Sequence, residues 1–552
     1  RRHKGKENSL CLLCALFVLF VVRSSPAAPP VLTSVFPAGT QRGTTVEVTA
    51  AGTFEHWPVQ AWVSGRSVSV ELGKDKGKLS VTVAADAVPG TYWLRLFDEQ
   101  GASSLRPFLV GTLPEVNERE PNDDPKSPQR LDGPCVVNGK LAKAGDVDGF
   151  AIECRQGQTL VAALEANATL RSPMDGVLQI VTPEGFVLAQ DNDTHGLDPF
   201  LAYPVPKDGT YIVRTFAFPA TPDSGIRFAG GDAFVYRLTL TTGEYADYVW
   251  PLAVPRYDPG GVSLVGWNLG EHRWKLNDIG VDTIPIFHAA IANSVSVTME
   301  SHGCAVKPEG SDPFALAPPM TVSGRLTRPK TADEFTFTAT KGDKFNFRVE
   351  SRTLGLPLVA ALRLTDDAGK EHAKADPPGF DKDPEVAFAA PRDGKYRLTV
   401  RDFYDNGGPR YVYRLRATRP EPDFAVALKA DRFTIEAGKT LDIAGTLQRL
   451  NGFTGDVELS AEGLPSGVVV APPDPAAKPG SPPTLRLSAK ADAKGSGPIR
   501  IIARPRVWPP NFTRTATAPL ADLAISTSDF WLTVTPPQEK KPSPDDAKKK
   551  SK

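Results

Sequence analysis

The stretch "VVNGKLAKAGDVDGFAIECRQGQTL" (Val136–Leu160) decides the fold, because it recurs as "TVSGRLTRPKTADEFTFTATKGDKF" (Thr321–Phe345). A constant offset of 185 residues relates the two copies and pairs Asp148 with Asp333. Apolar and polar residues alternate in "FAIEC" and "FTFTA", which is the period of a strand with one buried face. The repeat therefore predicts two copies of one antiparallel β-sandwich.

The composition of the whole chain favours the same fold class. The 552 residues are too many for a single core and suggest roughly three to five domains. Proline (52) and glycine (47) are abundant and methionine (3) is scarce, which is typical of short strands joined by turns. Lysine plus arginine and aspartate plus glutamate both number 64. No global field therefore favours a nucleic-acid partner or an anionic membrane.

A second repeat is interleaved with the first. "VFPAGTQRGTTVEVTAAGTF" (Val35–Phe54) is similar to "VWPLAVPRYDPGGVSLVGWNL" (Val249–Leu269), and each carries an arginine five residues after its first proline (Arg42 and Arg256). The block Asp423–Val534 contains a further set of alternating segments. The order of units is therefore small sandwich, repeat, small sandwich, repeat, small sandwich.

The two ends of the chain differ from the rest. A basic start, the apolar run Leu10–Val22 of 13 residues and the following "SSPAAPP" have the order of a secretory signal, with cleavage after Ala27. The apolar run is shorter than the ~20 residues of a spanning helix, although an uncleaved anchor remains the alternative. We expect an exported chain (secreted, periplasmic or on the cell surface) without a membrane span once mature. The lysine-rich end, Pro536–Lys552, predicts a disordered tail.

The first repeat resembles a known family. The segments "EPNDD", "VNGKL", "GDVDGFAI", "DGTY" and "VYRLTL" resemble the bacterial pre-peptidase C-terminal domain, and the second copy resembles it without "EPNDD". The interleaved units resemble immunoglobulin-like domains of the IPT/TIG type. Members of the first family are secreted β-sandwich appendages of proteases and of large surface proteins. The related collagenase collagen-binding domains use calcium.

The predicted fold class is all-β, with tandem antiparallel β-sandwiches of immunoglobulin-like or jelly-roll-like form. The predicted units are a signal peptide (1–28), an immunoglobulin-like domain (29–112), a first pre-peptidase-like sandwich (113–243), a partial immunoglobulin-like domain (244–310), a second pre-peptidase-like sandwich (311–420), a C-terminal immunoglobulin-like domain (421–535) and the tail (536–552).

The segment "EVNEREPNDDPKS" (Glu115–Ser127) is unusually rich in oxygen ligands. Calcium takes six to eight hard oxygens from carboxylates, amides and backbone, and alternate residues of an extended segment face the same way. The resemblance implies a collagenase-type calcium site, built from such a linker and a later acidic pair. The residues carried over are Glu118, Glu120, Asn122, Asp123, Asp146 and Asp148. The alternative is a solvated linker beside an acidic turn.

Two other segments bear on this calcium site. The second copy has "EGSDPFALAPPM" before Val322 and Thr331 in place of Asp146, so we expect it to have lost the site. The loop "DNDTHGLDPF" from Asp191 begins like an EF-hand loop, but Ala202 stands where a bidentate glutamate belongs. We interpret that loop as a hairpin turn.

Cys135 and Cys154 flank the first strand of the first copy, and their counterparts at the repeat offset are Met320 and Ala339. Because the two cysteines are present together and absent together, we predict a disulfide between them, as an exported chain permits. Cys304 then stays free or pairs between molecules.

The chain carries no recognisable catalytic motif. It has neither H-E-x-x-H nor G-x-S-x-G, and the proximity of His302 to Cys304 in sequence means little, because a fold must bring a base to a nucleophile. We therefore expect a non-enzymatic protein with no catalytic residues.

Three functions remain open. The first is a non-catalytic exported or surface protein that binds or spaces something, with calcium stiffening one linker. The second is a polymer-binding accessory protein for extracellular protein or polysaccharide, based on rings that can stack on sugars: Tyr245, Tyr248, Trp250, Trp267 and Trp274. The third is a hydrolase in the Asp247–Pro308 region.

Overall fold

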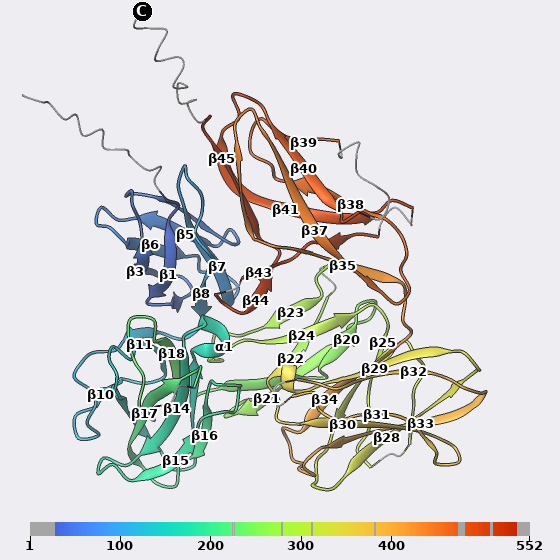
Figure 1. Ribbon diagram of the computed structural model, residues 1–552. Coiled ribbons are helices and arrows are strands. Elements are labelled where there is room, and N and C mark those ends of the chain that lie inside the picture. The colour runs from blue at the N-terminus through green and yellow to red at the C-terminus, as the bar shows by residue number, and fades with distance from the viewer. Residues whose placement is uncertain are drawn as a thin grey trace, which may run out of the picture.

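The computed structural model describes residues 28–537, except 223–224, 226, 278–279, 311–312, 380–381, 473–480, 508–511 and 521. The predicted signal peptide and tail therefore lie almost entirely outside the described residues. In the described part of the chain the sheets form five successive two-layer sandwiches, so the chain is all-β, as predicted (Figure 1). No helix among the described residues is long and apolar enough to cross a membrane.

The first and third sandwiches share a strand order. In the first, one sheet has the order β1 (Val31–Phe36), β3 (Thr45–Thr53), β6 (Lys78–Val83) and β5 (Val68–Leu72), and the other has β2 (Gly39–Gln41), β8 (Arg106–Gly111), β7 (Gly90–Phe97) and β4 (Gln60–Val63). The third has β19 (Tyr245–Trp250), β21 (Gly261–Trp267) and β22 (Arg273–Lys275) over β20 (Ala253–Pro255), β24 (Val295–Glu300) and β23 (Thr283–Ile286). The third is thus a shortened version of the first.

The second and fourth sandwiches also share one strand order. The second has the sheet β10 (Gln129–Arg130), β12 (Asp148–Cys154), β17 (Gly209–Pro219), β14 (Met174–Val181) and β15 (Val187–Asp191), over β16 (Phe200–Pro204), β13 (Thr159–Glu165), β18 (Val235–Thr241), β11 (Cys135–Lys140) and β9 (Glu115–Asn117). A short helix, α1 (Asn167–Leu170), follows β13.

In the fourth sandwich the matching sheets are β26 (Phe314–Ala315), β28 (Ala332–Ala339), β33 (Gly394–Asp402), β30 (Ala360–Asp366) and β31 (Glu371–Ala375), over β32 (Glu385–Ala389), β29 (Lys344–Glu350), β34 (Val412–Thr418), β27 (Met320–Arg325) and β25 (Gly303–Val306). A 3₁₀ turn, Arg352–Leu354, follows β29.

The strand β25 corrects one predicted boundary. The predicted partial immunoglobulin-like domain (244–310) includes 303–306, but β25 pairs in parallel with β27 and is the edge strand of the fourth sandwich. The reason is that a single edge strand has no repeat signal of its own: its residues "GCAV" do not match "EVN" of β9 in the second sandwich.

The fifth sandwich completes the described chain. One sheet has β35 (Asp423–Leu428), β37 (Thr440–Leu450), β40 (Thr484–Ala489) and β39 (Val468–Val470), and the other has β36 (Arg432–Glu436), β45 (Phe530–Thr535), β41 (Gly495–Pro505) and β38 (Val457–Glu462). The strand β42 (Arg514–Thr515) pairs with β41, and β43 (Ala518–Leu520) pairs with β44 (Ile525–Thr527).

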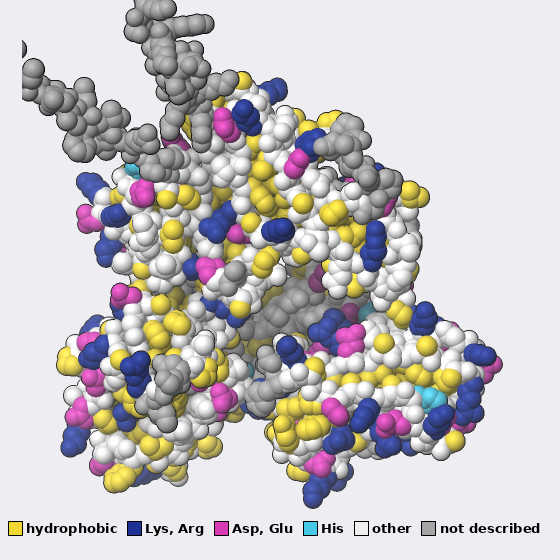
Figure 2. Space-filling view, viewed as in Figure 1, with side chains coloured by type: hydrophobic (Ala, Val, Ile, Leu, Met, Phe, Trp, Pro, Cys, Tyr) yellow, Lys and Arg dark blue, Asp and Glu magenta, His cyan; other side chains and the backbone are white. Residues whose placement is uncertain are grey.

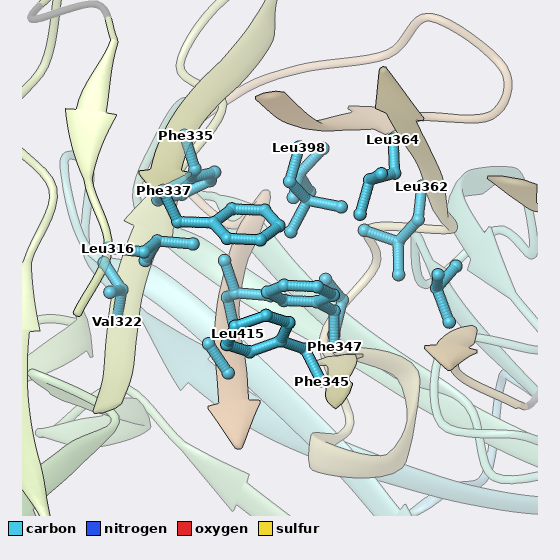
Figure 3. Packing of buried hydrophobic residues seen from close by; sticks show 14 of the residues in the cluster. Leu316, Val322, Phe335, Phe337, Phe345, Phe347, Leu362, Leu364, Leu398 and Leu415 are labelled. Atoms are coloured by element: carbon cyan, nitrogen blue, oxygen red, sulfur yellow. The ribbon is translucent and has the colours of Figure 1, made fainter. Parts of the chain in front are cut away.

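Each core follows from the alternation in the sequence. In the fourth sandwich, "EFTFTA" and "KFNFRV" direct four rings between the two sheets, as Figure 3 shows. Phe335 and Phe347 are fully buried, and the ring of Phe337 lies 5.1 Å from the ring of Phe347. Replacing one such ring by alanine removes about 3–5 kcal/mol of stability in typical cores.

The sandwiches also contact one another at apolar junctions. Ala38 and Leu109 of the first pack on Leu170 and Val235 of the second. The first and fifth, which are far apart in sequence, lie side by side (Figure 1). There Arg95 forms an ion pair of 2.7 Å with Asp431. The chain therefore folds back so that its last sandwich closes on its first.

Candidate metal centre

The oxygen-rich linker begins as an edge strand of the second sandwich. β9 runs parallel to β11, with Asn117 opposite Asn138. The Glu118 N–H then donates to the Asn138 carbonyl at 2.9 Å. This backbone pairing fixes the Glu118 side chain close to β11 and directs the following residues toward β12.

Three acidic groups converge where β12 begins. The carboxylates of Glu120, Asp146 and Asp148 have oxygens within 4.8 Å of one another. Asp146 and Asp148 are fully buried, whereas Glu120 is exposed. Acidic side chains are almost never fully buried unless they are paired, so this pair of aspartates requires an explanation.

Several buried oxygens in this region have no hydrogen-bond partner: Asp146 Oδ1, Asp148 Oδ1 and Asn122 Oδ1. The other oxygen of Asp146 accepts the Ala142 N–H at 2.5 Å. The Lys143 ammonium is 3.6 Å from Asp146 Oδ1 but is 68% exposed. A buried acceptor left without a partner is destabilising by about 1–3 kcal/mol, and more when it is charged.

One tyrosine hydroxyl joins two of the carboxylates. Tyr236 donates to Asp148 Oδ2 at 2.5 Å and lies 3.2 Å from Glu118 Oε2. Burial and the neighbouring charge of Glu118 raise the pKa of Asp148, and burial raises the pKa of Glu118. The physical cause is that two carboxylates share a poorly solvated space, which a cation would relieve.

Two glycines leave room for this arrangement. A β-carbon at Gly139 would lie 2.6 Å from Glu118 Oε2 and closer still to the Tyr236 ring. One at Gly149 would lie 2.8 Å from the Asn122 carbonyl oxygen. The linker and β18 can therefore approach β11 and β12 only because these positions carry no side chain.

The structure thus brings together most of the predicted ligands. Glu120, Asp146 and Asp148 form one group, Glu118 joins it through Tyr236, and Asn122 is buried beside β12. Asp123, in contrast, is exposed and outside the group. Tyr236 is not among the predicted ligands, although "VYRL" closes both repeats and is the sequence signal of a shared role.

The two cysteines of the predicted disulfide are free thiols in the structure. Cys135 begins β11 and Cys154 ends β12, so they come from opposite sheets, and both lie in the same buried core. Burial raises the pKa of each thiol to about 11. The structure therefore does not show the predicted disulfide, which stays a prediction for the exported chain.

The loop that begins like an EF-hand is a turn, but not the predicted hairpin. β15 and β16 on its two sides belong to different sheets. Asp191 accepts hydrogen bonds from the Thr194 hydroxyl at 2.9 Å and the Phe200 N–H at 2.8 Å. Asp191 thus stabilises a crossover between layers. The sequence could not show this because alternation does not reveal which sheet a strand joins.

Most of the aromatic cluster proposed for polymer binding lies at junctions between sandwiches. Tyr248 is buried, and Trp267 packs 4.8 Å from Phe200 of the second sandwich. The guanidinium of Arg325 lies 4.6 Å over the Trp250 ring. The Tyr245 ring is partly buried and lies 5.6 Å from Phe200 of the second sandwich. The Trp274 ring is partly buried against the third sandwich's own core. Four of the five rings therefore join sandwiches, and none of the five is fully exposed.

Two remaining features carry no evident chemistry. Burial raises the pKa of the Cys304 thiol to about 12, which disfavours the nucleophilic thiolate. A cavity of about 300 Å³ opens where the first three sandwiches meet. Charged groups that line this cavity already have partners: Arg237 pairs with Glu165 at 3.1 Å, and Asp198 accepts backbone N–H groups at the start of α1.

On the face shown in Figure 2, basic and acidic side chains of the described residues are interspersed.

No family model and no curated protein matches this sequence. Among solved structures, the chain is similar to the pre-peptidase C-terminal domain of collagenase from Bacillus anthracis, with 18% identity, 20% of this chain and 100% of that chain covered, and a TM-score of 0.17. A second is the M60 catalytic domain with the CBM51-1 and CBM51-2 domains of Clostridium perfringens ZmpB, with 10% identity, 71% of this chain and 46% of that chain covered, and a TM-score of 0.15.

A third similar structure is the D1–D4 ectodomain fragment of ICAM-5, with 12% identity, 88% of this chain and 97% of that chain covered, and a TM-score of 0.12. At these TM-scores the fold assignment rests on the sheets described above. The resemblance of both repeats to the pre-peptidase C-terminal domain stays a prediction.

Proposed function

We propose that this chain is a non-catalytic, exported binding or spacer protein whose first linker is fixed by a calcium ion. The observation that carries the proposal is the set of buried oxygens without partners at Asp146, Asp148 and Asn122. The signal-like N-terminus supports export, and an extracellular protein or polysaccharide is the partner class we expect.

The donor set fits calcium. Glu118, Glu120, Asn122, Asp146 and Asp148 would hold the ion. All of them offer hard oxygens, some from a linker that can adjust its position, as calcium coordination requires. Magnesium demands a smaller octahedral shell and retains its waters, so it should substitute poorly. A bound calcium ion would add positive charge where the described structure places only the largely exposed Lys143 ammonium, 3.6 Å from Asp146.

The site lies close to the contact between the first and second sandwiches, which we call the first junction. Glu115, at the start of β9, forms an ion pair with Arg237, and Arg237 lies against Gly39 and Gly111 of the first sandwich. Because β9 lies between this ion pair and Glu118, an ion that holds Glu118 and Glu120 also holds β9 in register. Calcium would thereby stiffen the linker between the first two sandwiches, which suits a spacer.

Hydrogen exchange of the full chain tests the proposal. At a hundredfold excess over its dissociation constant, calcium stabilises a binding-competent fold by about 2.7 kcal/mol. We expect exchange at β9, β11 and β12 to slow by up to about 100-fold when calcium replaces chelator. Asp146→Asn should abolish the response, and the matched control Asp123→Asn, which changes an exposed residue outside the group, should retain it. Identical exchange with calcium and with chelator would mean that the segment is only a linker.

A further inference from the structure

The backbone register shows which residue of the fourth sandwich corresponds to Glu118. β25 pairs with β27 as β9 pairs with β11, in parallel at the same edge. The Lys307 N–H donates to the Ser323 carbonyl at 3.0 Å, as the Glu118 N–H donates to the Asn138 carbonyl at 2.9 Å. Asn138 and Ser323 are related by the repeat offset. Lys307 therefore occupies the place of Glu118, with the opposite charge.

The Lys307 side chain is buried and reaches the equivalent aspartate. Only 2% of the side chain is exposed, and its Nζ lies 3.0 Å from Asp333 Oδ1. Asp333 is the counterpart of Asp148. The other oxygen of Asp333 accepts the hydroxyl of Tyr413, as Asp148 accepts that of Tyr236. The ammonium thus contacts the Asp333 oxygen whose counterpart in the second sandwich, Asp148 Oδ1, has no hydrogen-bond partner.

The other acidic groups have changed together with this lysine. Thr331 replaces Asp146, and its hydroxyl donates to the Arg328 carbonyl at 2.6 Å. Glu309, two residues after Lys307 as Glu120 is after Glu118, lies 3.9 Å from Arg325. The ammonium of Lys307 balances the charge of the carboxylate that it faces. In the second sandwich, four carboxylates gather in the equivalent region. Burial of a charge is tolerated when it is paired and hydrogen-bonded.

We propose that Lys307 is a tethered cation that takes the place of a metal ion in the fourth sandwich, which is therefore rigid without calcium. This inference rests on the proposed calcium site of the second sandwich for its functional meaning. The chain then contains one linker that responds to calcium, before the second sandwich, and one equivalent linker with a permanent internal cation, before the fourth. Calcium regulates the first junction alone.

Two substitutions in the full chain test this, with hydrogen exchange followed separately at β11–β12 and β27–β28. Lys307→Met removes the ammonium from the buried Asp333 carboxylate, a loss that corresponds to about 100-fold or faster exchange at β27–β28, and calcium should not reverse it. Lys341→Met, which changes an exposed lysine of the same sandwich, should have no effect. Glu118→Lys should slow exchange at β11–β12 in chelator and remove the calcium response there.

The outcomes separate the two proposals. Wild-type β27–β28 exchange that slows with calcium, or that is unchanged by Lys307→Met, would overturn the tethered-cation proposal. So would a Glu118→Lys variant that exchanges in chelator as fast as the wild type. A wild-type β11–β12 region that ignores calcium would overturn the calcium proposal alone. In that case, slower β11–β12 exchange in Glu118→Lys than in the wild type would still show that a lysine ammonium at this position stabilises the second sandwich.

Discussion

The contact between the first and fifth sandwiches depends on a buried ion pair, and we predict that Asp431→Ala opens it. Arg95 and Asp431 side chains are 1% and 5% exposed, with 2.7 Å between their charged atoms. Arg95 also lies 5.7 Å over the Trp531 ring. Removing one partner of a buried pair leaves an uncompensated charge and typically destabilises by about 3–5 kcal/mol. Such a loss accelerates exchange of the interface amides by about two to four orders of magnitude.

Hydrogen exchange at β7 and β45 measures this effect. The same interface offers a matched control, because Arg106 pairs with Asp522 at 2.6 Å but Asp522 is 44% exposed. The Arg106 side chain is 10% exposed, but it also donates to the Thr33 and Leu105 carbonyls at 2.6 and 2.8 Å and so keeps partners when Asp522 is removed. A pair that solvent screens on one side contributes about 0.2–1 kcal/mol, so Asp522→Ala should accelerate exchange by less than about tenfold. If the two variants have equal effects, burial does not decide the strength of this junction and the reasoning is wrong.

Three further predictions concern other parts of the chain. In exported protein, mass mapping without reduction should find Cys135 linked to Cys154, a bond that stabilises by about 3 kcal/mol; two free thiols would contradict it. Trp267→Ala should destabilise the chain by about 2–3 kcal/mol, less than a full core ring, without reducing retention on polysaccharide gels; normal stability with lost retention would restore the polymer-binding hypothesis. A hydrogen bond with His372 holds the pKa of Asp366 far below its usual range, so its stabilisation is present above about pH 4 and falls as the pH approaches that lowered pKa. Acid titrations of wild type and Asp366→Asn that coincide would refute this.

Much of the fold could be predicted because the repeat is periodic in two senses. Alternation within "FAIEC" and "FTFTA" indicates strands, and the constant offset indicates that both copies share a topology, as the sheet orders show. The residues of the acidic group could also be found, because Glu120, Asp146 and Asp148 come from oxygen-rich segments only 26 and 28 positions apart.

The partners of that group could not be predicted from the sequence. Tyr236 lies 88 positions from Asp148, and its counterpart is shifted from the repeat offset because the intervening loops differ in length. Lys307 likewise can be recognised as the equivalent of Glu118 only from the register of β25 on β27 and of β9 on β11. Asp123 belongs to the same oxygen-rich segment, yet it is exposed. It lies out of step with the alternate positions that Glu118, Glu120 and Asn122 occupy.

The most direct test of the central claim is a calorimetric titration of calcium into the chelator-stripped full chain. We expect one strongly bound ion per chain, weaker binding of magnesium, and no binding by Asp148→Asn, because Asp148 provides a buried oxygen that has no other partner. A wild-type chain that binds no calcium, or an Asp148→Asn variant that binds it with unchanged stoichiometry and affinity, would contradict the metal centre described above.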